Sequence, residues 1–388
     1  MLAYIVRRLV YGALTLLVLS VIVFLLVQFG GGSPLDRLKL NPRMANVIVK
    51  LTERYGLDLP IYQQYFKWLS GFVTPERFVV SGVAPWVALG SGIAVSAGMF
   101  AAKVKATWWR PTRAATVTVV WLSLFWFIRS RVDFAMDWGN SFRGDGPVWD
   151  AVFGAAGATF RLGFAALALA LIIGIPLGIF QAIKQYSFFD QVGTFGSFLA
   201  FSTPIFIIAI GLQVVLAFYV DRWTGIKPFF TVGMTEVGYD NLSRLAQFGD
   251  IARHLALPAT SIALISIAGY SRFQRAAMLE VMHSDYLRTA KAKGLPRRTV
   301  VLKHALRNAM LPIVTLVSLD IAGIIGGAII TESIFGWPGV GRLYIGAINA
   351  VDYPVIMAIV MVIGAGIVLM NIVADILYGV LDPRVRYE

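Results

Sequence analysis

The chain lacks cysteine altogether and has only three histidines in 388 residues. Without cysteine there is no disulfide and no thiolate chemistry, and three histidines leave little room for a histidine metal site. No Gly-Lys dipeptide occurs, so the G-x-x-x-x-G-K-[ST] phosphate loop is absent. The patterns H-E-x-x-H and G-x-S-x-G are absent as well. We therefore expect no catalytic residues, no cofactor and no metal, and no ATP hydrolysis by the chain itself.

Charge is also scarce, because only 14% of the residues are charged while 58% are apolar. A soluble protein carries about 25% charged residues. Several charge-free stretches reach the roughly 20 residues that a helix needs to cross a bilayer. The sequence thus predicts an all-α, polytopic membrane protein. The net charge of +13 is attributed to basic loops on the inner side of the membrane. The expected partner of these loops is membrane lipid and not nucleic acid.

The charge-free stretches predict about eight transmembrane helices. The expected spans are 9–29, 78–102, 114–128, 162–183, 191–220, 255–271, 311–330 and 353–374. An uncleaved first span is favoured over a signal peptide, since its apolar stretch is long and shows no small-residue cleavage site. Ser202-Thr203-Pro204 predicts a kink, and amphipathic helices are expected around Met44–Tyr55 and Tyr62–Leu69.

An even number of spans places both termini on one side of the membrane. With both termini in the cytoplasm, the inner segments carry 18 Lys/Arg and six Asp/Glu, which is +12 of the net +13. Basic residues near short loops favour the cytoplasmic side. The basic segment 37–77 goes against this orientation, although long segments translocate despite their charge.

The stretch Glu280–Pro312, the basic loop, concentrates this charge between two apolar segments. Arg272 and Arg275 precede it, and its own basic residues are Arg288, Lys291, Lys293, Arg297, Arg298, Lys303 and Arg307. Gly294-Leu295-Pro296 interrupts two runs that otherwise favour helix. We predict a helix, a tight turn and a helix on the membrane surface. Charge alone fits equally an ordinary loop that sets topology.

Asp320 is the one charged residue inside a predicted span. An intramembrane carboxylate is a functional-site hypothesis by default, because it is costly to keep there. The alternative is a structural role, with a hydrogen bond to Ser318, Thr315 or another helix, or a protonated side chain.

A family resemblance follows from the basic loop. Tyr286–Leu295, with Arg307-Asn308-Ala309 and Leu311-Pro312 after it, resembles the signature loop of ABC-importer permeases. That motif opens with Glu-Ala-Ala, whereas Arg288-Thr289-Ala290 stands here. This variant resembles the first, B-type, subunit of dipeptide, oligopeptide and nickel permeases. Four further stretches agree: Tyr4–Leu9, Tyr55–Asp58 with Pro60, Thr331–Arg342 (TESIFGWPGVGR) and Leu381–Arg384.

The resemblance implies the type I ABC importer permease fold with an extra transmembrane hairpin, since such permeases commonly have six spans. It covers about 1–77 and 136–388. We accordingly expect four parts: the first span with an extracytoplasmic segment at 1–77, an inserted hairpin at 78–132, the permease core at 157–376, and a cytoplasmic tail at 377–388.

The resemblance also implies a function, which is the import of di- or oligopeptides across the inner membrane. The implied partners are a second permease in a heterodimer, two ABC ATPase subunits and an extracytoplasmic substrate-binding protein. The loop residues implied in ATPase coupling are Tyr286, Leu287, Arg288, Thr289, Ala290, Lys293, Gly294 and Leu295. Leu287, Leu295 and Val301 are expected to enter a groove on the ATPase. Asp320 and Glu332 are candidates for the translocation path.

Two other classes of function stay open. One is a secondary transporter driven by an ion gradient, with Asp320 as the relay, although the internal repeats typical of such folds are not found. The other is an intramembrane enzyme or a receptor, for which no nucleophile–base pair is visible. The substrate itself cannot be read from the chain.

Overall fold

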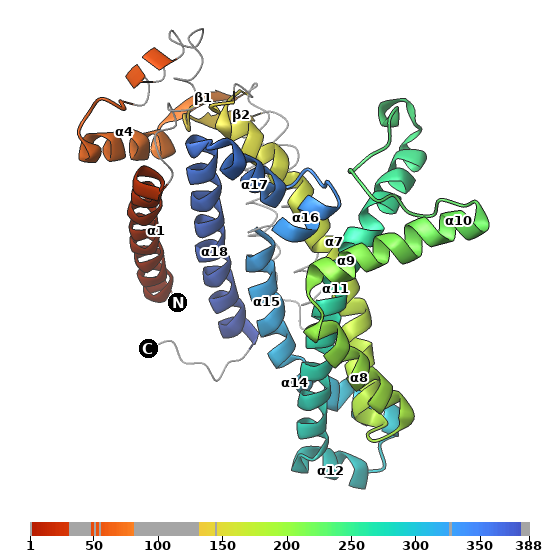
Figure 1. Ribbon diagram of the computed structural model, residues 1–388. Helices are drawn as coiled ribbons and strands as arrows, with labels where there is room; N and C mark the ends of the chain where they lie inside the picture. Colours follow the sequence, from red (N-terminus) through yellow and green to blue (C-terminus); the bar gives the residue numbers. More distant parts are fainter. Residues whose placement is uncertain are drawn as a thin grey trace. The chain divides into compact units, whose positions relative to one another are not determined.

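The computed structural model describes residues 2–30, 48–49, 52–53, 56–80, 132–143, 146–325 and 328–381. The chain divides into two compact units, one formed by 1–37 with 141–388 and the other by 38–140. Helices make up most of the described residues (Figure 1), which confirms the predicted helical membrane protein.

The described residues of the smaller unit include helix α4 and a two-stranded sheet. Helix α4 (Ile61–Val73) confirms the helix expected near residue 62. Strands β1 (Pro75–Val80) and β2 (Val132–Met136) pair antiparallel, with Val80 opposite Val132. The all-α prediction missed this ladder, and the span expected from Phe78 begins with strand residues. A charge-free run of aromatic and β-branched residues suits a strand as well as a helix.

The remaining predictions for this part of the chain cannot be compared with the structure. Residues 81–131, which hold nearly all of the expected hairpin, lie outside the described residues. Most of the helix expected at 44–55 does so too, although 48–49 and 52–53 are helical.

The candidate membrane spans among the described residues lie in the larger unit. Five of its described helices are long and apolar enough to cross a bilayer: Arg7–Gly30, Val148–Ile183, Ile205–Thr224, Arg244–Met282 and Tyr353–Ile372. A sixth is reached if the pair 297–309 and 312–321, bent by 45°, counts as one span. These six correspond to six of the eight predicted spans, and the other two belong to the expected hairpin, of which residues 81–131 lie outside the described residues.

These spans are parts of longer elements. Helices α1 (Leu2–Gly30), α7 (Val148–Ile183), α11 (Arg244–Met282), α15 (Leu311–Ile325) and α18 (Tyr353–Leu381) are continuous. Helix α9 (Ile205–Leu212) continues through a π-helical turn at Gln213–Tyr219 into α10 (Val220–Thr224).

The predicted kink at Pro204 is a full break. The expected span 191–220 is divided into α8 (Phe188–Ser202) and α9, with Thr203 extended between them at φ −87° and ψ 125°. Proline has no N–H to continue the helix and pushes the preceding residue toward extended backbone. The span therefore begins at Ile205.

Helices α7 and α11 form the centre of the larger unit. Small residues let them approach closely, since a Cβ added to Gly178 would overlap the backbone carbonyl of Ser271. Leu162 and Ala166 of α7 share a buried cluster with Ala259 of α11. Helix α15 packs on α7 and α18, and α1 packs on α18.

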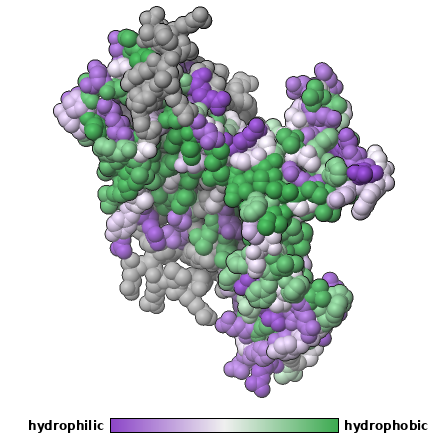
Figure 2. All heavy atoms as spheres, in the orientation of Figure 1, coloured by the Kyte–Doolittle hydropathy of each residue, from purple (hydrophilic) through white to green (hydrophobic). Residues whose placement is uncertain are grey.

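Shorter elements lie at the two ends of the larger unit. At one end, the loop end, are α12 (Asp285–Ala292), α13 (Arg297–Thr299), a π-helical turn at Val300–Ala305 and α14 (Leu306–Ala309). At the other, the cavity end, are α16 (Ile329–Ile334) and α17 (Val340–Ala350) (Figure 1). The surface around α12 is largely hydrophilic, whereas the spans beside it are mostly hydrophobic (Figure 2).

Candidate functional site

The basic loop has the helix–turn–helix form that the sequence predicts. Helix α12 ends at Ala292, and α13 starts after Pro296. Between them Gly294 has φ +75°, in the left-handed region that glycine adopts without strain. A Cβ added to Gly294 would have no atom within 4 Å, so the constraint there is the backbone and not space.

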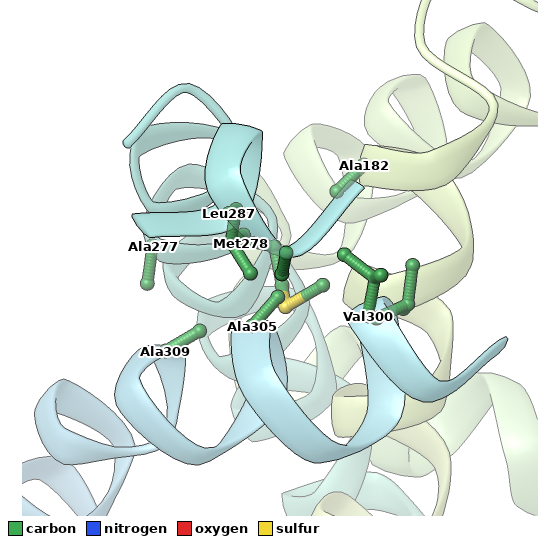
Figure 3. Close-up of a cluster of buried hydrophobic side chains, with 9 residues drawn as sticks. Ala182, Ala277, Met278, Leu287, Val300, Ala305 and Ala309 are labelled. Carbon is green, nitrogen blue, oxygen red and sulfur yellow. The ribbon is translucent and has the colours of Figure 1, made fainter. Parts of the chain in front are cut away.

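The inner face of the loop is buried against the chain's own spans. Leu287 has no exposed surface and belongs to a cluster with Met278 at the end of α11 and Val300 of the returning segment (Figure 3). The other buried members are Ala182, Ala277, Ala290, Val301, Ala305 and Ala309. Because Leu287 and Ala290 are three residues apart on α12, they share one helix face.

This burial corrects one expectation. Leu287 and Val301 were expected to enter a partner's groove, but both are buried within this chain. The sequence shows that these residues are apolar, but it does not show that the ends of α7 and α11 cover them. Of the three, Leu295 alone keeps a large exposed fraction, 38%.

The outer face of the loop is exposed and polar. Tyr286, Arg288, Thr289 and Lys293 are all exposed. The side chain of Asn308 donates a 2.7 Å hydrogen bond to the Tyr286 hydroxyl, which ties the returning segment to α12. Arg288 lies 3.7 Å from Asp285, an exposed ion pair of the kind that contributes little stability.

A partly buried ion pair beside the loop was not predicted. Arg275 of α11 donates two hydrogen bonds to Asp190 at the start of α8, 2.8 and 2.9 Å long. The backbone N–H of Tyr186 donates a third, at 2.9 Å. The hydrogen bond from Arg275 is the main reason that the pKa of Asp190 lies below its usual range, although burial acts the other way. The pair fixes the α7–α8 turn to α11.

Asp320 also has a partner on another helix. Its carboxylate accepts a 2.5 Å hydrogen bond from the Tyr270 hydroxyl of α11. The side chains of Thr315 and Ser318, which were the expected local partners, lie outside the described residues. The structural alternative for Asp320 included a hydrogen bond to another helix, and Tyr270 of α11 is the donor of such a bond.

Both path candidates border one cavity, the Asp320 cavity. It has a volume of about 280 Å³, lies between α7, α11, α15 and α16, and is lined by Asp320 and Glu332 among mostly apolar residues. No lysine, arginine or histidine is among the described residues that line it. The structure therefore brings the carboxylates of α15 and α16 to one cavity.

The two carboxylates differ in how they are held. Glu332 is wholly buried, and it accepts hydrogen bonds from the Thr159 hydroxyl at 2.8 Å and the Arg342 backbone N–H at 3.1 Å. A Cβ added to Gly339 would overlap its carboxylate. Glu332 thus holds the turn after α16 in place, whereas Asp320 is exposed to the cavity. A path role for either stays a prediction.

Two family models match this chain. "Binding-protein-dependent transport system inner membrane component" matches residues 174–387, and "Binding-prot-dependent transport system membrane comp, N-term" matches residues 1–105. The chain belongs to this family. It is a multi-pass membrane component of a transport system, and the resemblance to ABC peptide permeases is confirmed.

Curated relatives of this chain are named as peptide permeases. A putative peptide permease protein of Brucella suis is 34% identical over all of this chain and 99% of its own. The oligopeptide transport system permease protein AppB of Bacillus subtilis is 31% identical over the whole of both chains. The dipeptide transport system permease protein DppB of Escherichia coli is 36% identical over 65% of this chain and 77% of its own. Segment 78–132 lies within the aligned range of the first two.

Proposed function

We propose that this chain is one of two permease subunits of an ATP-driven peptide importer. A second permease completes the path, two ATPase subunits dock at the basic loop, and an extracytoplasmic binding protein delivers the peptide. The names of the relatives support peptide as the cargo. The observation that carries the coupling role is the loop's two-sided build, with an apolar face packed on the spans and a polar face left exposed.

This build suits the transmission of motion. A push by an ATPase on the exposed face passes through the contact of Leu287 with Met278 to the end of α11. The pair of Asp190 with Arg275 joins α8 to the same helix. Packed elements move as rigid bodies between discrete arrangements. Displacement of α11 changes the wall of the Asp320 cavity, which gives alternating access without chemistry in this chain.

The orientation follows from the same assignment. The loop end faces the cytoplasm with both termini, and the cavity end faces the extracytoplasmic side of the inner membrane. The Asp320 cavity then lies in the membrane between them, where Asp320 and Ser266 offer polar groups to a passing peptide.

Substitution of Gly294 tests the coupling role. Gly294→Val forces a β-branched side chain into a left-handed backbone, which distorts the turn at a cost of about 1 kcal/mol or more. We expect normal insertion and normal pairing with the second permease, weaker retention of the ATPase on pull-down, and loss of uptake. Uptake is measured in membranes matched for permease content.

Gly225→Val is the matched control for that substitution. Gly225 also has a positive φ, +67°, and open space around its Cβ position, but it follows α10, which lies well away from α12 (Figure 1). It should leave ATPase retention unchanged. Normal ATPase retention and uptake in Gly294→Val would remove the loop from the coupling mechanism.

The ion-gradient alternative has its own test, because Asp320 is a carboxylate facing a cavity within the spans. Uptake that persists without ATP and stops when the gradient collapses would assign Asp320 to an ion relay. We expect the reverse, together with no ATP hydrolysis by the purified chain alone.

A further inference from the structure

A second and larger cavity, the arginine cavity, lies at the cavity end of the larger unit. Its volume is about 890 Å³, within the range of about 300–1,000 Å³ typical of ligand sites. Its α7 wall recedes because small residues line it, namely Ala151, Gly154, Ala155, Gly157 and Ala158. A Cβ added to Gly154 or Gly157 would have no atom within 4 Å, so the space beside them is open.

Arg161 of α7 and Arg342 of α17 both line this cavity, and neither is paired with a carboxylate among the described residues. An Arg161 Nη1 lies 3.6 Å from the Met234 sulfur, and an Arg342 Nη1 donates to the Gly336 carbonyl. Both partners are neutral, so two guanidinium charges face the same cavity without compensation by an anion.

The acidic residues of the cavity do not supply that anion. Asp352 is buried, and its two oxygens accept hydrogen bonds from the Ser141 hydroxyl at 2.5 Å and the Phe142 backbone N–H at 3.2 Å. Asp150 and Arg143 also line the cavity, and each makes contacts of its own.

The backbone segments that carry the two arginines are linked by hydrogen bonds to one residue, Glu332. The backbone N–H of Arg342 donates to Glu332, and Glu332 accepts in turn from Thr159, two residues before Arg161 on α7. Thr159 and Glu332 line the Asp320 cavity, whereas Ala158 and Gly339 beside them line the arginine cavity. The arginines therefore stand on a fixed wall that separates the two cavities.

We propose that Arg161 and Arg342 bind the C-terminal carboxylate of the peptide in the arginine cavity. The planar guanidinium group favours carboxylates, which it holds through paired hydrogen bonds. The volume suits a short peptide. This inference rests on the proposed function, because it assigns the chemistry of a cargo-binding site within the same path.

Chemical protection tests the site without requiring transport. The assembled transporter, without binding protein, is treated with phenylglyoxal, and modification of each arginine is followed by mass spectrometry. Tri-alanine should slow modification of Arg161 and Arg342 about threefold or more near saturation. Tri-alanine amide, which lacks the carboxylate, should not. Arg222 and Arg244, exposed arginines that do not line the cavity, are internal controls.

Three outcomes would overturn the proposal. Equal modification rates with and without tri-alanine would show that no carboxylate binds. Equal protection by the peptide and its amide would show that the carboxylate is not recognised. Protection by the peptide-free binding protein, and not by tri-alanine, would assign the arginines to a docking surface.

Substitution gives an independent readout in uptake. Arg161→Gln and Arg342→Gln should each lower uptake of tri-alanine at subsaturating concentration about tenfold. This is the decrease in affinity expected when one charge-assisted hydrogen bond is lost. Arg222→Gln and Arg244→Gln should leave it unchanged. Normal uptake by both cavity variants would reject the site while leaving the importer intact. Absence of peptide uptake by the unaltered transporter would instead reject the proposed function, and this inference with it.

Discussion

The loop end and the cavity end of the larger unit are both chain connections outside the spans, but they are anchored in opposite ways. At the loop end, Leu287 and Val301 are buried among alanines and Met278, and the charges are outside. At the cavity end, two carboxylates, Glu332 and Asp352, are buried, and both oxygens of each accept a hydrogen bond.

The difference has a consequence for movement. Apolar contacts are non-directional, so a hydrophobic anchor tolerates small shifts of the loop against the spans. Buried carboxylates require their donors at fixed positions, because an unpaired one is costly. We therefore expect the loop end to move during coupling and the cavity end to stay rigid, and four substitutions test this contrast.

The largest effect is expected for Glu332→Ala at the cavity end. It leaves the Thr159 hydroxyl and the Arg342 N–H unpaired in a buried site, at about 1–3 kcal/mol each. The apparent melting temperature of the purified chain should fall by several degrees. Glu332→Gln keeps one acceptor oxygen, so its melting temperature should fall by less. Equal melting of the Ala variant and the unaltered chain would contradict a rigid polar anchor.

Leu287→Ala tests the hydrophobic anchor at the loop end. Loss of a fully buried leucine costs about 2–5 kcal/mol. We expect the loss to stay local, with faster amide hydrogen exchange across 285–309 and unchanged exchange in α7 away from the turn that holds Ala182, which belongs to the same cluster. Leu302→Ala is the control, because Leu302 lies in the same loop and is 48% exposed. Exchange that rises equally in both variants would show that the cluster does not hold the loop.

Asp190→Asn asks whether the ion pair beside the loop adds a polar anchor there. Loss of a hydrogen-bonded charge pair costs about 1.5–3 kcal/mol. Because the pKa of Asp190 is lowered on folding, its contribution is present above the unfolded value of about 4 and is lost as pH falls through the folded value. The melting temperatures of the Asp190→Asn variant and the unaltered chain should differ at pH 7 and converge in acid. A constant difference across this range would contradict the assignment.

Arg288→Gln should have the smallest effect. The pair with Asp285 is exposed at both side chains, and such pairs contribute at most a small stabilisation. Melting should be unchanged, while ATPase retention on pull-down should weaken if the outer face is the docking surface. Unchanged retention in this variant and in Lys293→Gln would exclude a charge contribution from the loop to docking.

Elements that depend on local pattern were predictable. The spans follow from stretches without charge, and the loop turn follows from Gly294 and Pro296. Pro204 predicted a kink within one span, whereas the structure has a break between α8 and α9 there. The strand at Phe78–Val80 was missed because the same run satisfies both a helix and a strand, and its partner 132–136 lies far along the chain.

The sequence by itself determined the class of protein, since crossing a bilayer depends on consecutive apolar residues and leaves a readable record in the chain. Its motifs also pointed to the family. Only the tertiary structure decided which loop residues face inward and how each acidic residue is used. Asp190 and Arg275 are 85 positions apart, Tyr270 and Asp320 are 50, and Thr159 and Glu332 are 173. No local periodicity connects such pairs, because their contacts arise when α7, α8, α11, α15 and α16 pack together.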